Sequence, residues 1–288
     1  MEINLEEIKK RKKIKELLEF SIINIDKPAG PTSFSTDLVI KTALGINKTS
    51  HFGTLDPAVT GVLPVALGRA CRLMNYFIGK KKTYVGIMRV HKETSEKELN
   101  KIIKEFIGEI TQLPPVKSRV KREERQRTVY SFKILEHDRN DFLFETEVQA
   151  GTYIRKLCDD IGKKIGGAHM LELRRTKASI FEESKSYTIY EFLDAVEKCK
   201  KCDEKDLRKM LIPGEIISEV LPIVQIKKEA VGKIYHGSPI FKTNIEGSTP
   251  KSEIAAGFYK DRFIGVFKIV NEKGVIAKPE FVLQPINK

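Results

Sequence analysis

The sequence contains no long apolar run, and no stretch approaches the ~18 consecutive apolar residues typical of a membrane-spanning helix. Residues 1–20, MEINLEEIKKRKKIKELLEF, also lack the apolar core of a secretory signal, because charged residues interrupt them throughout. Their spacing instead predicts an amphipathic helix with Ile8, Leu17 and Leu18 among its apolar positions. We therefore expect a cytoplasmic protein without a membrane partner.

Cysteine is scarce, with four in 288 residues. Cys199 and Cys202 form a CKKC motif, which by itself could indicate a zinc site or a redox-active pair. A structural zinc site needs a second ligand pair, but Cys71 and Cys158 stand alone in apolar segments and no histidine is near the motif. We therefore interpret the cysteines as free thiols and predict no metal site.

The charge, in contrast, is plentiful and strongly unbalanced. Lys and Arg number 52 against 39 Asp and Glu, a net charge of +13 with a pI near 9.4. Such a balance favours a polyanionic partner, most often nucleic acid, because bound phosphates replace condensed counterions. A generally lysine-rich surface is the alternative interpretation.

Apolar periodicity and Gly/Pro punctuation predict a mixed set of elements in residues 21–210. Strands are expected at 21–33, 62–68, 81–91 and 169–181, and a hairpin at 128–151 around Arg139-Asn140. Helices are expected at 35–45 (ended by Gly45), 95–108 (Ser95 N-cap, ended by Gly108), 152–166 (capped by Thr152), and twice between Tyr187 and Met210. Because the strands do not follow strict βαβ order, we predict an α+β fold around a mixed, mostly antiparallel sheet.

The composition changes near PGEIISEVLP, residues 213–222. Beyond it, short strand-like segments broken by Gly and Pro begin at 233–241 and predict a small β-barrel. The expected domains are an N-terminal extension at 1–20, a main domain at 21–215 and the barrel at 216–288.

The segment HFGTLDPAVTGVLP, residues 51–64, combines one carboxylate, Asp56, with Gly53, Pro57 and Gly61. Glycine permits positive φ and proline fixes φ, so we predict a shaped loop carried on the buried strand that follows. Ordered loops of this kind often present functional side chains. An Asx-turn would be the purely structural role for Asp56.

Four motifs together resemble the TruB family of pseudouridine synthases. They are INIDKPAGPTS (23–33), HFGTLDPAVTGVLPVALGRACRL (51–73), KKTYVGIMRVH (81–91) and AGTYIRKLCDDIG (150–162), and they occur in the family's order. Within the family, KTYVGIMRVHKE, LPPVKSRVKREERQRTVY and GAHMLELRRTKAS resemble the archaeal and eukaryotic dyskerin branch. The resemblance implies the pseudouridine synthase fold, and the predicted C-terminal barrel would then correspond to a PUA-like RNA-binding domain.

The activity that this resemblance implies is the isomerisation of uridine to pseudouridine within RNA. The N-glycosidic bond breaks, the uracil rotates, and a carbon–carbon bond forms to the same sugar. The reaction needs no cofactor, and no P-loop, dinucleotide fingerprint or HExxH motif occurs. It does need a carboxylate near the sugar, as nucleophile or as base. The family match gives this catalytic role to Asp56.

The same match assigns the substrate pocket. Tyr84 would stack on the flipped base, Arg155 would pair with a buried Asp56 carboxylate through two parallel donors, and Leu157 would form an apolar wall. His51 suits stacking or steering of the nucleotide, and Lys27 would help to shape the pocket. Without the family, Tyr84 and Leu157 are ordinary core residues, Arg155 a surface residue and His51 a hydrogen-bonded loop histidine.

A basic segment, residues 112–127, lacks apolar periodicity and is predicted to be a loop that contacts RNA. Its cations are Lys117, Arg119, Lys121, Arg122, Arg125 and Arg127. Arg174, Arg175 and Lys177 could extend the same basic surface. A solvated charge run is the alternative.

The leading hypothesis is the catalytic subunit of an archaeal-type H/ACA guide particle. The implied partners are guide RNA, target RNA (rRNA, and tRNA as a further target), small H/ACA protein cofactors and a kink-turn-binding protein. Two alternatives remain open: a stand-alone tRNA pseudouridine synthase and a noncatalytic RNA-binding scaffold. A redox or zinc protein built on CKKC is a more distant one.

Overall fold

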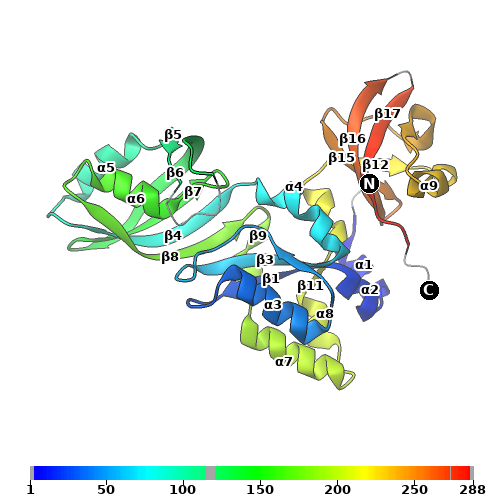
Figure 1. Ribbon diagram of the computed structural model, residues 1–288, viewed down its shortest axis with the longest axis horizontal. Helices are drawn as coiled ribbons and strands as arrows, with labels where there is room; N and C mark the ends of the chain where they lie inside the picture. The colour runs from blue at the N-terminus through cyan, green and yellow to red at the C-terminus, as the bar shows by residue number, and fades with distance from the viewer. Residues whose placement is uncertain (1–2, 115–120, 273, 286–288) are drawn as a thin grey trace.

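The structure is a computed structural model that describes residues 3–114, 121–272 and 274–285. Its main feature is an eleven-stranded sheet whose principal path runs β10-β1-β3-β8-β4-β7-β6-β5 (Figure 1). Two neighbouring pairs, β1–β10 and β3–β8, are parallel, and the others are antiparallel. The predicted α+β class with a mixed, mostly antiparallel sheet is confirmed. The strands are β1 (Phe20–Lys27), β2 (Thr49–His51), β3 (Thr60–Gly68), β4 (Lys82–Val90), β5 (Gly108–Gln112), β6 (Arg125–Asp138), β7 (Asp141–Val148), β8 (Ala168–Ala178), β9 (Phe181–Glu182), β10 (Tyr187–Thr188) and β11 (Leu211–Pro213).

Helices pack against this sheet and close its core. Figure 1 shows α5 and α6 at the end formed by β5, β6 and β7, while α3, α7 and α8 lie near β1. Among the described residues, no helix is long and apolar enough to cross a membrane. These helices are α1 (Leu5–Arg11), α2 (Ile14–Glu19), α3 (Ser33–Leu44), α4 (Met74–Ile78), α5 (Glu96–Lys104), α6 (Ile154–Gly162), α7 (Ile189–Lys200) and α8 (Lys205–Met210), while α9 (Lys228–Tyr235) packs on the second sheet.

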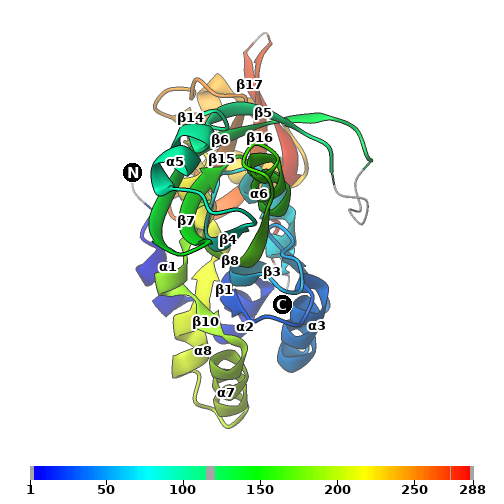
Figure 2. The ribbon, with the colours of Figure 1, turned by 90° about the vertical axis from the view of Figure 1, so that its left-hand side faces the viewer.

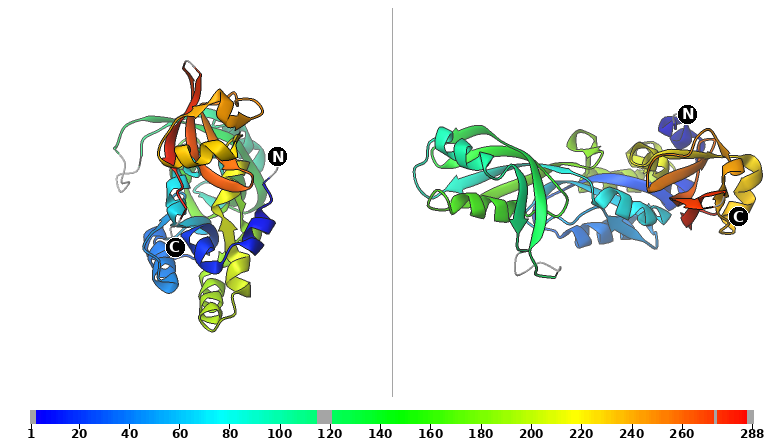
Figure 3. Two further views of the ribbon diagram at one scale, coloured as in Figure 1. Left: turned by 90° about the vertical axis from the view of Figure 1, so that its right-hand side faces the viewer. Right: turned by 90° about the horizontal axis from the view of Figure 1, so that it is seen from above.

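A second, barrel-like sheet stands at one end of the elongated molecule (Figure 3). Its order is β13-β17-β16-β15-β12-β14, with β12 (Ile223–Ile226), β13 (Ile240–Phe241), β14 (Ile245–Glu246), β15 (Ile254–Tyr259), β16 (Arg262–Glu272) and β17 (Val275–Val282). Phe263 of this sheet stacks on Phe20 of β1 with ring centroids 5.4 Å apart. One buried apolar cluster therefore joins the two sheets. The small C-terminal β-barrel is confirmed, whereas the domain limits at 20 and 215 stay predictions.

The predicted single N-terminal helix is wrong, because α1 and α2 are separated at Lys12 and Lys13. Ile8 and Leu17 are buried, as the amphipathic pattern predicts. The break lies where Lys12 extends to the buried carboxylate of Glu215, with Nζ 2.6 Å from Oε1. This contact spans most of the sequence, so local spacing could not reveal it.

Several element ends also differ from the predicted ones. Helix α5 ends at Lys104, and Gly108, with φ of 103°, begins β5 instead of ending the helix. Thr152 does not cap α6, because its hydroxyl donates to the Gln149 carbonyl at 2.8 Å. The strand expected at 233–241 is mostly wrong, since α9 extends to Tyr235 and buries Ala230 and Ile234 on one face.

Candidate active site

Asp56 lies in a loop, residues 52–57, between the edge strand β2 and the buried strand β3. This segment is called the Asp56 loop below. Gly53 adopts φ of 109°, a conformation that side chains rarely tolerate, and a Cβ there would lie 3.2 Å from Cε of Lys82. The Asp56 side chain is 57% exposed, so the loop presents its carboxylate to solvent.

The backbone of the Asp56 loop is held by side chains from distant elements. Ser33, at the start of α3, bonds Leu55 twice: the Leu55 N–H donates to Oγ at 2.8 Å, and Oγ donates to the Leu55 carbonyl at 3.0 Å. Arg175 of β8 donates through Nη2 to the Gly53 carbonyl at 2.9 Å and through Nε to the Val62 carbonyl at 2.8 Å. Because both contacts are to main-chain atoms, they fix the path of the loop.

Lys27, at the end of β1, anchors the far side of the same loop. Its Nζ donates to the carbonyls of Pro28 (2.6 Å), Pro31 (2.9 Å) and Pro57 (3.1 Å). The side chain is fully buried, and burial lowers the pKa of Lys27 while the Asp56 charge opposes that shift. The expectation that Lys27 helps to shape the pocket agrees with this geometry, although its role in the reaction stays a prediction.

The structure brings Arg155 to Asp56 across 99 positions of sequence. Nη2 of Arg155, in the first turn of α6, lies 2.7 Å from Oδ2 of Asp56. The expectation of a buried, doubly bonded carboxylate is wrong, because the two side chains are 54% and 57% exposed and share this one contact. Water screens such a pair, so Arg155 orients the carboxylate without burying it.

Tyr84 and Leu157 lie in the core. Tyr84 of β4 is 7% exposed, and Leu157 of α6 is fully buried. Both belong to the apolar cluster that contains Leu55, the residue before Asp56. Their predicted contacts with a flipped base stay predictions, because neither side chain presents much surface to solvent here.

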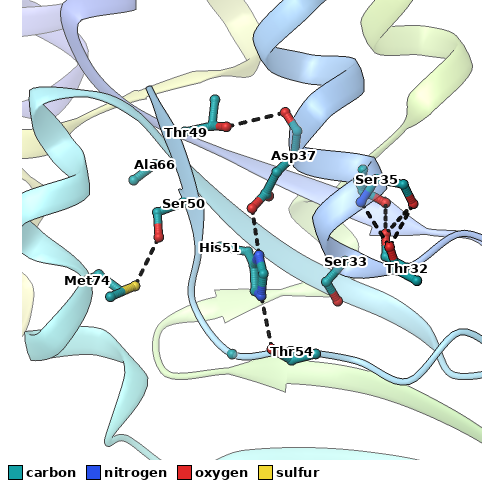
Figure 4. A network of polar contacts seen from close by, with 12 residues as sticks. Thr32, Ser33, Ser35, Asp37, Thr49, Ser50, His51, Thr54, Ala66 and Met74 are labelled. Carbon is teal, nitrogen blue, oxygen red and sulfur yellow. Dashed lines mark hydrogen bonds and ion pairs between the residues drawn. The ribbon is translucent and has the colours of Figure 1, made fainter. Parts of the chain in front are cut away.

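His51, the last residue of β2, forms part of a polar network rather than standing free (Figure 4). Its Nδ1 lies 2.6 Å from Oδ2 of Asp37 on α3, and its Nε2 lies 3.0 Å from Oγ1 of Thr54 in the Asp56 loop. These three residues line a groove of about 540 Å³ between α3, β2 and α4. His51 is thus oriented at both ring nitrogens, which matches the hydrogen-bonded alternative and leaves its steering role a prediction.

The described part of the basic segment projects from the body at the adjoining ends of β5 and β6 (Figure 2). The predicted loop is too long, because Arg125 and Arg127 belong to β6 and pair with Gln112 and Ile110. Lys121 is 82% exposed and contacts Glu123 at 2.8 Å. Arg122 is also exposed, and Lys117 and Arg119 lie outside the described residues.

The extension of this basic surface through 174–177 is wrong for Arg175 and stays a prediction for Arg174 and Lys177, whose side chains are 38% and 45% exposed. Arg175 is 1% exposed, and its buried guanidinium donates to the Gly53 carbonyl of the Asp56 loop. Arg174 binds both oxygens of Asp26 at 2.9 and 2.8 Å, and Lys177 contacts Glu182 at 2.6 Å. Arg174 and Lys177 are thus paired with nearby carboxylates at the surface, whereas Arg175 points into the protein.

Sequence reasoning missed Ser33, Asp37, Lys82 and the true role of Arg175. Lys82 is 6% exposed, donates to the Ile78 and Lys80 carbonyls, and packs beneath Gly53. Burial, with the Arg175 charge as a second cause, lowers the pKa of Lys82 to about 8. The sequence does hold one signal for two of them: Ser33 lies in the motif at 23–33 and Lys82 in the motif at 81–91.

The cysteines and the other metal-ligating residue types form no cluster at this site. All four cysteines are free thiols, and Cys202 is exposed just after α7. Within the described ranges, no three His, Cys, Asp or Glu side chains converge as a metal site would require.

Comparisons with known proteins agree on one family. The profile described as "TruB family pseudouridylate synthase (N terminal domain)" matches residues 41–154, and that of the "tRNA pseudouridylate synthase B C-terminal domain" matches residues 155–218. The chain is 41% identical to the probable tRNA pseudouridine synthase B of Sulfurisphaera tokodaii, over 96% of this chain and 86% of that protein. It is 42% identical to the protein of the same name from Methanocaldococcus jannaschii, over 93% and 78%.

Solved structures give the same result for the whole chain. A chain from the crystal structure of a Cbf5-Nop10-Gar1 complex matches with a TM-score of 0.88 and 37% identity, over 96% of this chain and 89% of that one. A chain from the structure of an H/ACA RNP bound to a substrate RNA containing 2'-deoxyuridine matches with a TM-score of 0.87 and 36% identity, over the same shares.

Proposed function

The chain belongs to the TruB family and is an RNA pseudouridine synthase, and we propose that a guide RNA directs it to its target uridines with Asp56 as the catalytic carboxylate. The observation that carries the catalytic assignment is the Asp56 loop. Ser33, Lys27 and Arg175 hold its main chain, while the Asp56 carboxylate stays exposed beside Arg155. Pre-positioning of this kind is what a single reacting group requires.

The reaction requires few further groups from the protein. The bond between N1 of uracil and C1' of the sugar breaks, the ring rotates, and C5 bonds to C1'. The proton on C5 is then lost and N1 gains one, so the product is an isomer of the substrate. Asp56 acts at the sugar–base junction, as nucleophile or as base. Arg155 keeps the carboxylate oriented through one charge-assisted contact of 2.7 Å.

Guide direction is supported by the two similar chains of known structure, which come from a Cbf5-Nop10-Gar1 complex and from a substrate-bound H/ACA RNP. By that likeness, the partners of this chain are small proteins of the Nop10 and Gar1 kind, guide RNA and target RNA, together with the expected kink-turn-binding protein. The exposed cations Lys121 and Arg122 and the PUA-like barrel would hold the RNA backbone.

A second candidate, tRNA modification without a guide, rests on the name of the archaeal relatives, which are probable tRNA pseudouridine synthases. The test incubates the purified chain with unmodified tRNA, and separately with target RNA, guide RNA and the small partner proteins. Pseudouridine is mapped in both reactions, with Asp56→Asn and Asp56→Ala as controls. Product that depends on guide and partners supports our proposal, and product in tRNA alone supports the second candidate.

Failure of both reactions would favour the scaffold alternative, provided that the Asp56 variants bind RNA like the wild type. Product from Asp56→Asn at the wild-type rate would instead show that Asp56 takes no part in the reaction, although the protein is a pseudouridine synthase.

A further inference from the structure

Asp37, His51 and Thr54 form a linear chain of polar contacts from helix α3 to the Asp56 loop (Figure 4). Oδ2 of Asp37 lies 2.6 Å from Nδ1 of His51, and Nε2 of the same ring lies 3.0 Å from Oγ1 of Thr54. Thr54 is two positions before Asp56. The chain therefore ends inside the loop that carries the reacting carboxylate.

For a neutral imidazole, the chemistry of the three groups gives the hydrogen bonds one direction. An ionised carboxylate only accepts, so Asp37 places the proton of a neutral imidazole on Nδ1. Nε2 is then the acceptor, and the Thr54 hydroxyl donates to it. Asp37 thus sets the tautomer of His51 and, through it, the rotamer of Thr54.

Asp37 is poorly explained as a stabilising residue. It is 8% exposed, and its second oxygen, Oδ1, is buried without a hydrogen-bond partner among the described residues. A buried carboxylate oxygen left unpaired is unfavourable for folding. An unpaired buried oxygen beside a reactive loop points to a role in function rather than in stability.

We propose that Asp37 is a positioning residue for the isomerisation, which holds the first half of the Asp56 loop through His51 and Thr54. Ser33, Arg175 and Lys27 bind the main chain of this loop. The contacts from Asp37 through His51 instead fix the side chain of Thr54, which lines the groove of about 540 Å³. The inference rests on the proposed function, because it assumes that Asp56 reacts.

The test compares Asp37→Asn with the wild type in single-turnover reactions at saturating RNA. The amide keeps the shape but not the charge, and its NH₂ group can donate to Nδ1 and favour the other tautomer. We expect the rate constant to fall about tenfold, which corresponds to the loss of one charge-assisted hydrogen bond. The Kd for RNA should change less than about threefold. The melting temperature is expected to stay within about 3 °C.

Two further variants separate positioning from packing. Thr54→Val removes the hydroxyl and should reproduce the loss, while Thr54→Ser should retain the wild-type rate. The double variant Asp37→Asn/Thr54→Val should be no slower than either single one, since both break the same chain. Glu96→Gln is the matched control, because it removes the carboxylate 3.4 Å from an exposed histidine, His137, away from the site.

Nitrogen-15 NMR of His51 supplies a readout that does not depend on activity. We expect the Nδ1–H tautomer in the wild type and a shift toward Nε2–H in Asp37→Asn. A wild-type rate in Asp37→Asn overturns the inference, as does additive loss in the double variant or an Nε2–H tautomer in the wild type. If the wild type modifies no RNA, the proposed function fails, and the tautomer alone decides whether Asp37 orients His51.

Discussion

The Asp56 loop and the basic segment are both polar, irregular stretches of this chain, yet they are built in opposite ways. In the Asp56 loop, residues from β1, α3 and β8 bind three different backbone positions. In the described part of the basic segment, the cations bond locally: Lys121 to Glu123, Arg125 to the Lys121 carbonyl, and Arg127 to the Gln126 carbonyl.

The difference follows from what each region must do. A carboxylate that reacts at one carbon atom has to sit within a fraction of an ångström of its place, so its loop is tied to the core. Cations that meet a phosphate backbone act through long-range charge and adapt to it, so they need exposure rather than fixed geometry. The predictions below test this contrast.

The largest effect is expected for Asp56→Asn. Loss of the carboxylate should lower the single-turnover rate of pseudouridine formation by at least about a thousandfold, because the amide can act neither as nucleophile nor as base. RNA affinity, measured by filter binding, should stay within about threefold. Asp141→Asn, which breaks the exposed Arg89 pair, is the control and should react normally.

Lys27→Met tests the anchoring of the loop without touching the carboxylate. Three carbonyls lose the Lys27 donor, and that of Pro57 beside Asp56 keeps only the Gly30 N–H at 2.9 Å, so the carboxylate should shift from its place. We expect roughly a hundredfold lower rate with RNA affinity nearly unchanged. Lys101→Met on the exposed face of α5 is the matched lysine control. Wild-type activity in a folded Lys27→Met protein would show that the loop does not need this anchor.

Charge reversal in the basic segment should give the opposite pattern. For Lys121→Glu/Arg122→Glu we expect about tenfold weaker RNA binding and a shallower salt dependence, while the rate at saturating RNA is retained. Lys97→Glu/Lys101→Glu on α5 makes the same change in net charge at another exposed place. Equal losses in both double variants would mean that net charge, and not this segment, attracts the RNA.

The last effect concerns stability beneath the loop rather than activity. Burial lowers the pKa of Lys82 from 10.5 to about 8, so between these values the unfolded chain holds a proton that the folded chain has released. Stability therefore rises with pH through this window and falls as the pH drops through 8. Denaturant unfolding at pH 7.5 and pH 10 should show a gain of roughly 2 kcal/mol for the wild type relative to Lys82→Met. A constant difference between the two proteins would contradict this.

Much of the fold was predictable because local signals agree with it. Gly45 ends α3 in the left-handed conformation, and the β6–β7 hairpin turns at Arg139-Asn140, where Arg139 has φ of 51°. The errors arose where a distant partner overrides local pattern. Lys12 meets Glu215 and breaks the N-terminal helix, and Arg125 pairs with Gln112 and extends a strand into the expected loop.

The sequence by itself determined the motifs, and through them the family and the prediction of Asp56 as the catalytic carboxylate, while the order of its periodic segments predicted the α+β class. These properties depend on residue identity and order, which four motifs in series specify. Only the tertiary structure decided that Arg155 meets an exposed carboxylate through one contact, that Arg175 lies inside rather than on the basic surface, and that Asp37 reaches the loop through His51. Those facts depend on which strands pair and which side chains burial forces together, and neither is encoded in local spacing.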